Sequence, residues 1–179
     1  MYWRGTIDPS LARRSGFGGT TLLHFAAGAG DVERTRLLLS FGAEVNARSF
    51  EDGHTPLYYA INVGATETTE LLIQHGADVK VHSGPIRGTL LHVAARRDNV
   101  AIGKLLLAAG ADIEARDIKG ETPLRRALNC RQPGMVELLV ANSANLDAPD
   151  KRGVTPWQYA KKRGLRLPSS ETITWQETR

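Results

Sequence analysis

A threonine recurs five times along this 179-residue chain at intervals of 33 or 34 residues, and this regularity constrains the fold more than any other feature. The five positions are Thr21, Thr55, Thr89, Thr122 and Thr155. In the first four copies a Gly-Ala or Ser-Ala pair follows 21 residues after the threonine, at Gly42, Gly76, Gly110 and Ser143. Self-similarity at a period of 20–50 residues is typical of stacked repeats. The chain is therefore predicted to consist of copies of one supersecondary unit.

Residues 89–117 show what one copy contains. Thr89 is suited to the first position of a helix because its hydroxyl accepts hydrogen bonds from unpaired backbone amides. A second helix is predicted from Val100, where Leu105 and Leu106 contribute apolar residues at helical spacing and are expected in the core. Gly110 ends this helix, since glycine adopts a positive φ without steric cost. Two such short helices cannot bury their own apolar faces, so each copy requires neighbours.

The openings of the five copies read TLLH, TPLY, TLLH, TPLR and TPWQ, and the pattern resembles the ankyrin repeat. The resemblance implies an all-α solenoid of stacked helix-turn-helix repeats with short β-hairpin finger loops. We expect an array over residues 16–167, with repeats near 19–48, 53–81, 87–116 and 120–149 and a half repeat at 153–167. Residues 1–15 are expected to form an irregular leader, and residues 168–179 a polar tail.

Several residues depart from the repeat pattern. Ser143 takes the place of the closing glycine and is expected to adopt its left-handed backbone. Arg131 stands where glycine ends the first helix in other copies, and Arg87 stands where other copies have a finger glycine, so a distorted hairpin is predicted at residues 82–88. In the first copy, Arg34 and Thr35 are polar where the third copy is apolar or small, and we expect both to face water at the end of the array.

Composition and targeting signals limit the cellular compartments in which the protein is expected. Cys130 is the one cysteine, which excludes an intramolecular disulfide and fits a reducing compartment. No apolar run approaches the ~20 residues that span a bilayer, and no secretion signal is recognised. We expect a monomer without a membrane segment, located inside the cell in the cytoplasm or nucleus. Export as an effector remains an alternative.

Candidate catalytic or metal-binding residues are few. The family resemblance implies that His24 and His92 each close a hydrogen-bond network with the opening threonine of the repeat. Neither has Cys, Asp or Glu at metal-ligand spacing, and no base is nominated for Cys130. The glycines near Gly16 lack the Lys-Ser/Thr of a phosphate-binding loop. We therefore expect no enzyme activity, no metal and no cofactor.

The charge of the chain is asymmetric. Residues 1–88 hold eight Lys/Arg against nine Asp/Glu, a net −1, whereas residues 89–179 hold fifteen against ten, a net +5. The family resemblance implies recognition through the finger tips and first-helix ends. On that strip we expect partner-binding residues at Glu51, Asp52, Arg87, Arg96, Arg97, Lys119, Lys151, Arg152, Lys162 and Arg163.

The sequence thus predicts a non-enzymatic adaptor or scaffold that binds another protein, with an acidic partner surface meeting the basic half. One alternative is nucleic-acid binding through the basic half, although the strip lacks the interleaved aromatic residues that stack on single strands. Another is the recognition part of an effector or a ubiquitin-ligase adaptor.

Overall fold

The computed structural model describes residues 12, 19–50, 53–83, 87–165 and 167. The chain divides into two compact units, residues 1–78 and 79–179, and each is described by itself. Of the expected leader and tail, Ala12 alone falls within the described residues, so both remain predictions.

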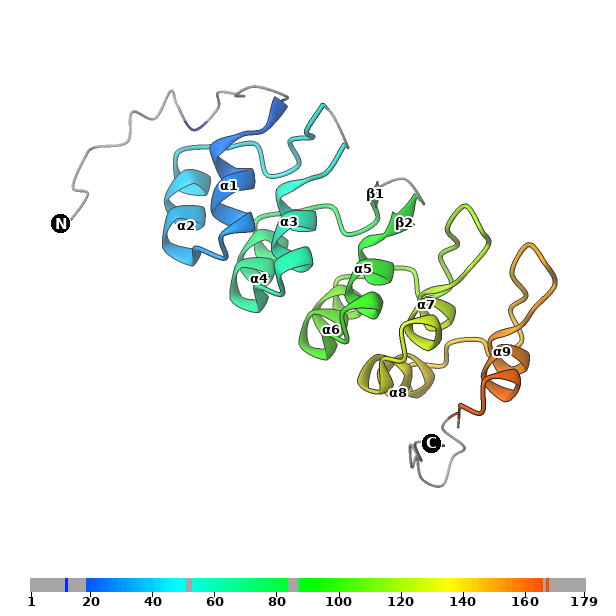
Figure 1. Ribbon diagram of the computed structural model, residues 1–179. Coiled ribbons are helices and arrows are strands. Elements are labelled where there is room, and N and C mark those ends of the chain that lie inside the picture. Colours follow the sequence, from blue (N-terminus) through cyan, green and yellow to red (C-terminus); the bar gives the residue numbers. More distant parts are fainter. Residues whose placement is uncertain (1–11, 13–18, 51–52, 84–86, 166, 168–179) are drawn as a thin grey trace. The chain divides into compact units, whose positions relative to one another are not determined.

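The first unit, blue to cyan in Figure 1, contains two helix pairs. They are α1 (Leu22–Gly28) with α2 (Val32–Ser40), and α3 (Pro56–Val63) with α4 (Thr66–Gln74). The first helices α1 and α3 pack side by side, as do the second helices α2 and α4. This is the stacking that the repeat pattern predicts.

The second unit, green to orange in Figure 1, continues the pattern. Its elements are β1 (His82–Ser83), β2 (Gly88–Thr89), α5 (Leu90–Arg96), α6 (Val100–Ala108), α7 (Pro123–Asn129), α8 (Pro133–Ala141) and α9 (Pro156–Lys162). The first helices α5, α7 and α9 pack in that order, and α6 packs on α8. Repeat five contributes α9 and no second helix within the described residues. The predicted all-α ankyrin-type fold is confirmed.

The cores of the repeats are formed by leucines on the inner sides of the helices. Leu23 and Leu57 are fully buried in the first unit, as are Leu91 and Leu106 in the second. Leu105 is only half-buried, so the expectation that it equals Leu106 in the core is wrong. The helical period places one of two adjacent leucines inward and turns the other about 100° away.

The two polar residues of α2 that were expected to face water, Arg34 and Thr35, differ in their exposure. Arg34 is exposed, and its guanidinium pairs with Asp31 at 3.0 Å. Thr35, however, is fully buried, because it lies on the face of α2 that packs against α4. The prediction that Thr35 faces water is therefore wrong.

The turns follow the sequence closely. Ser143 has φ 64° and Arg131 has φ 55°, so both adopt the left-handed backbone of the glycines that they replace. Arg87 has φ 46°. The base of its hairpin is antiparallel, with His82 opposite Thr89 and Ser83 opposite Gly88. The distortion expected at residues 82–88 concerns the tip, which lies outside the described residues, and stays a prediction.

His24 and His92 have the structural role that the family resemblance implies. The backbone N–H of Thr89 donates to Nδ1 of His92 at 3.1 Å, and the ring Nε2 donates to the carbonyl oxygen of Glu121 at 2.9 Å. His24 makes the corresponding contacts with Thr21 (3.0 Å) and with the carbonyl of His54 (3.0 Å). Each ring therefore joins one repeat to the next. Burial lowers the pKa of both imidazoles, which keeps them neutral.

Candidate protein-binding surface

Two finger loops of the second unit are shaped by an aspartate at equivalent positions. We call residues 116–121 finger four and residues 149–154 finger five. In finger four, Oδ1 of Asp117 accepts hydrogen bonds from the backbone N–H groups of Lys119 (2.8 Å) and Glu121 (3.0 Å). In finger five, Oδ1 of Asp150 accepts from Arg152 (2.8 Å) and Val154 (3.0 Å). Each carboxylate fixes the turn that presents the cations at its tip.

The two fingers are bonded to each other through their backbones. The N–H of Lys151 donates to the carbonyl oxygen of Lys119 at 3.0 Å. The guanidinium of Arg116 donates to the carbonyl of Gly120 at 3.0 Å and also to that of Pro149. Lys119, Lys151 and Arg152, all exposed, therefore form one cationic edge at the finger tips.

A second group of cations lies at the other end of the first helices. Arg96 is the last residue of α5 and Arg97 is its C-cap, while Lys162 and Arg163 hold the same positions on α9. All four are exposed. Because α5, α7 and α9 pack in order and each has seven residues, these ends lie about 10 Å along the helix axis from the helix starts that follow the fingers. The predicted cations thus occupy two rows, one at each end of the first helices.

Between these rows lies a compensated charge network. The guanidinium of Arg126 contacts Oδ2 of Asp117 at 2.6 Å and Oε2 of Glu121 at 3.1 Å. Asn129 donates to the same Glu121 oxygen at 3.1 Å and accepts from Arg125. The side chain of Asp117 is 0% exposed. The carboxylates of Asp117 and Glu121 are therefore both engaged by Arg126 within the protein.

Arg125 connects repeat four to repeat five. Its guanidinium carbon lies 3.3 Å from the centre of the Tyr159 ring, and its Nη2 lies 3.9 Å from the carboxylate of Asp150. Arg163 approaches the same ring at 5.4 Å. A buried arginine over an aromatic face is stabilised by the negative potential of that face. This contact holds α9 and finger five against α7.

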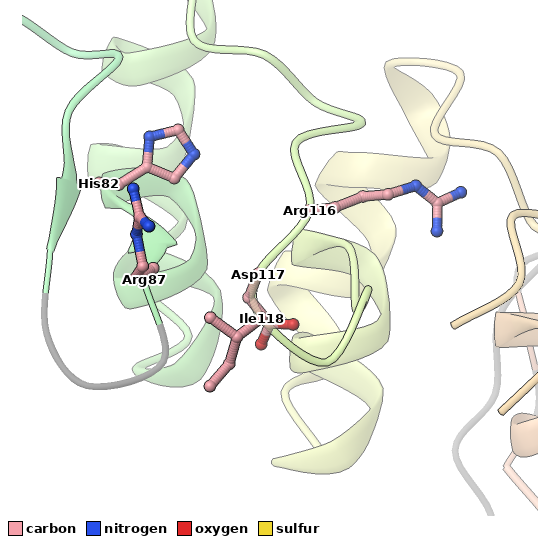
Figure 2. A pocket seen from close by; sticks show the side chains of 5 residues that line it. All are labelled: His82, Arg87, Arg116, Asp117 and Ile118. Carbon is pink, nitrogen blue, oxygen red and sulfur yellow. The ribbon is translucent and has the colours of Figure 1, made fainter. Parts of the chain in front are cut away.

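The remaining predicted residues fall into two groups. Arg87 is exposed and, with His82, Arg116, Asp117 and Ile118, lines a hollow of ≈ 270 Å³ between its own finger and finger four (Figure 2). Glu51 and Asp52 lie outside the described residues.

Sequence reasoning missed the arginine and tyrosine network. Two signals were present in the sequence. The opening TPLR places an arginine where repeats one and three have histidine, and an aspartate precedes the opening threonine by five residues in both repeats four and five. Neither signal says that Arg125 meets the ring of Tyr159 and the carboxylate of Asp150, because those two groups belong to the following copy.

Other sites were searched among the described residues. No group of three or more His, Cys, Asp or Glu could hold a metal ion there. Cys130, the C-cap of α7, is half-buried. None of the described helices has the length and apolar character needed to cross a membrane.

Comparison with known proteins agrees with this geometry. A family model described as ankyrin repeats (3 copies) matches residues 6–83 and 86–167. No curated protein matches the chain. Ankyrin repeats are generally protein–protein interaction modules, and the fold is typically non-enzymatic. With the stacked helix pairs, the threonine–histidine networks and this match over most of its length, the chain belongs to the ankyrin repeat family.

Proposed function

We propose that this protein is a non-enzymatic recognition module that binds an acidic peptide or an acidic protein surface through residues 79–179. The observation that carries the proposal is the bonded pair of fingers, which holds Lys119, Lys151 and Arg152 together at one edge. Arg87, Arg96, Arg97, Lys162 and Arg163 extend the same positive charge over the finger and helix ends.

The physical basis is additive charge on a prearranged surface. The Debye length at physiological salt is about 8 Å, so cations on adjacent fingers act on a ligand together. Backbone hydrogen bonds fix the tips before binding, which reduces the conformational entropy lost when a partner docks. Arginine also pairs with carboxylates through two parallel hydrogen bonds. An acidic partner is therefore both attracted and oriented.

The proposal places the module inside the cell as a monomer and as part of an adaptor or scaffold. The single cysteine supports a reducing compartment. The finger and helix-end cations supply the surface by which such an adaptor would recognise its partner.

Selection of random 12-residue peptides displayed on phage, with this protein immobilised, tests the proposal. The selected peptides are expected to be enriched in Asp and Glu. The double variant Lys119→Glu with Lys151→Glu should lose this enrichment. The matched control, Arg36→Glu with Lys104→Glu, makes the same change in net charge at exposed positions on second helices α2 and α6, and should keep it.

Two results would contradict the proposal. One is a set of selected peptides with no acidic preference. The other is equal loss of binding in both double variants, which would show that net charge acts without a defined site. A labelled single-stranded oligonucleotide, titrated in parallel, tests the nucleic-acid alternative. Binding that is tighter than for the acidic peptides and is lost in the finger variant would favour that alternative.

A further inference from the structure

The hollow between finger three (described at residues 82–83 and 87–88) and finger four has two kinds of wall. Figure 2 shows the Arg87 side chain directed toward the His82 ring on one hairpin, while Ile118 extends toward them from finger four. Ile118 is 45% exposed, so its aliphatic side chain is accessible at the tip of finger four. The hollow therefore presents an apolar wall beside two nitrogen-bearing side chains.

The other two lining residues are already engaged elsewhere. Asp117 has a fully buried side chain that accepts from two backbone amides and pairs with Arg126. Arg116 points away from His82 and Arg87 in Figure 2, because its guanidinium bonds to carbonyl groups of fingers four and five. The functional groups that a ligand meets in the hollow are thus those of Arg87, His82 and Ile118.

The backbone of Arg87 is left-handed, with φ 46°, at a position where fingers two, four and five have glycine, at Gly53, Gly120 and Gly153. Arg131 and Ser143 also replace glycine at left-handed positions, so the backbone strain alone assigns no role. What sets Arg87 apart is that its side chain lines the hollow.

We propose that this hollow receives an aliphatic side chain of an extended acidic segment, with a carboxylate beside it on Arg87 and His82. The inference rests on the proposed function and specifies the ligand of that same surface. The volume of ≈ 270 Å³ lies below the roughly 300–1,000 Å³ of small-molecule sites, so it suits a side chain rather than a cofactor. A guanidinium next to an apolar wall selects a carboxylate next to an aliphatic group.

The spacing of the repeats sets the spacing of the ligand motif. Neighbouring first helices pack about 8–10 Å apart, and an extended chain advances about 3.3 Å per residue. A segment anchored in the hollow therefore reaches the edge formed by Lys119 and Lys151 about three residues later. The ligand is an aliphatic residue beside an acidic one, with further acidic residues about three positions along.

Two fluorescein-labelled 12-residue peptides test the inference by fluorescence anisotropy. Both carry six Asp or Glu residues in the same positions, and they differ only in a central Leu or Ser. The wild-type protein is expected to bind the Leu peptide several-fold more tightly, up to about tenfold, because the central leucine can bury its side chain against Ile118. Ile118→Ser should remove this preference and leave the affinity for the Ser peptide nearly unchanged.

Arg87→Gly tests the cationic wall, and Arg131→Gly is its matched control. Both replace an exposed arginine with a positive φ by glycine, so both remove one charge and relieve the same backbone strain. Arg87→Gly should weaken binding of both peptides about fivefold or more, whereas Arg131→Gly should leave it nearly unchanged. Thermal melts confirm that both variants fold.

The outcomes separate the two proposals. Equal affinity of the wild type for the Leu and Ser peptides, or equal effects of the two arginine variants, overturns the inference and leaves the acidic-partner proposal standing. A wild-type protein that binds neither peptide overturns the acidic-partner proposal and the inference with it.

Discussion

At the scale of single residues, the left-handed turn positions show how local backbone geometry and side-chain contacts compete. Ser143 is exposed with φ 64°, so its Cβ is strained and its side chain is not packed. Asp98 has a similar φ of 53°, but its Oδ1 accepts the backbone N–H of Met135 at 2.7 Å. This carboxylate caps α8, whose own N-cap residue, Gln132, makes no side-chain cap bond. Replacing Ser143 or Asp98 by glycine is therefore expected to change the stability differently, although the two residues have similar φ angles.

Ser143→Gly should raise the free energy of unfolding by about 0.5–1 kcal/mol. Relief of the left-handed strain, roughly 1–2 kcal/mol, exceeds the entropy that glycine adds to the unfolded chain, roughly 0.5–1 kcal/mol. Urea denaturation followed by circular dichroism measures the change. Ala109→Gly is the control, because this exposed C-cap has φ −82° and gains nothing from glycine. Asp98→Gly should not stabilise, since it also removes the cap. A lower midpoint for Ser143→Gly would contradict the argument.

Stability should also fall in mild acid because of the buried histidines. Burial, the largest cause, lowers the pKa of His24 and His92 from the usual 6.5. Below about pH 6.5 the unfolded chain binds protons that the folded rings do not, so the free energy of unfolding decreases as the pH falls. In the folded state, protonation also removes the Nδ1 acceptor of the Thr89 N–H.

Urea melts between pH 7.5 and 5 measure this slope. His92→Gln should reduce it, and glutamine suits the position because Gln158 forms the corresponding capping box with Thr155 in repeat five. His75→Gln is the control, since this exposed ring is not among the groups that shift the pKa of His92. A slope that is unchanged in His92→Gln would show that the titration arises elsewhere.

At the scale of elements, α6 shows how a helix is held by its neighbours. It packs on α5 and α8, and Leu106 is fully buried among them whereas Leu105 is half-buried. Leu106→Ala should lower the free energy of unfolding by about 2–5 kcal/mol, because transfer energy is lost and a cavity is left behind. Leu105→Ala should cost clearly less. Denaturant melts compare the two, and hydrogen exchange should show loss of protection in α8 for Leu106→Ala. Equal costs would mean that both leucines share one environment.

The elements also show what could be predicted from sequence. The repeat spacing predicted the helix pairs and the left-handed turns at Ser143 and Arg131, because those depend on local chemistry and a fixed period. The same reasoning placed Thr35 in water and Leu105 in the core. Both errors concern which side of a helix meets the next repeat, a property of packing between helices. The partners of Arg125 and Arg126 were missed for the same reason, since the ring of Tyr159 and the carboxylate of Asp117 come from other segments.

At the scale of the whole molecule, charge is distributed unevenly along the chain, and this determines how binding should depend on salt. Reversing Arg96 and Arg97 to Glu should greatly weaken binding of an acidic partner, because both side chains are exposed and their charges change sign; a thermal melt checks that the variant remains folded. Affinity should also fall as salt rises, since screening weakens attraction between exposed charges. Isothermal titration with the selected acidic peptides at about 50 and 300 mM salt measures both effects. A partner whose affinity survives the reversal and high salt would show that the helix-end cations are only a solvated surface.

The contact between Arg125 and Tyr159 has a consequence for how such an array can change during evolution or design. Repeat arrays commonly gain and lose units because neighbouring copies are interchangeable. Repeat four is not, because the buried guanidinium of Arg125 depends on a ring and a carboxylate supplied by the following copy. A repeat four followed by a copy that lacks these two groups would leave that charge covered but without its partners, which is unfavourable. The order of the last two repeats is therefore fixed by the chemistry between them.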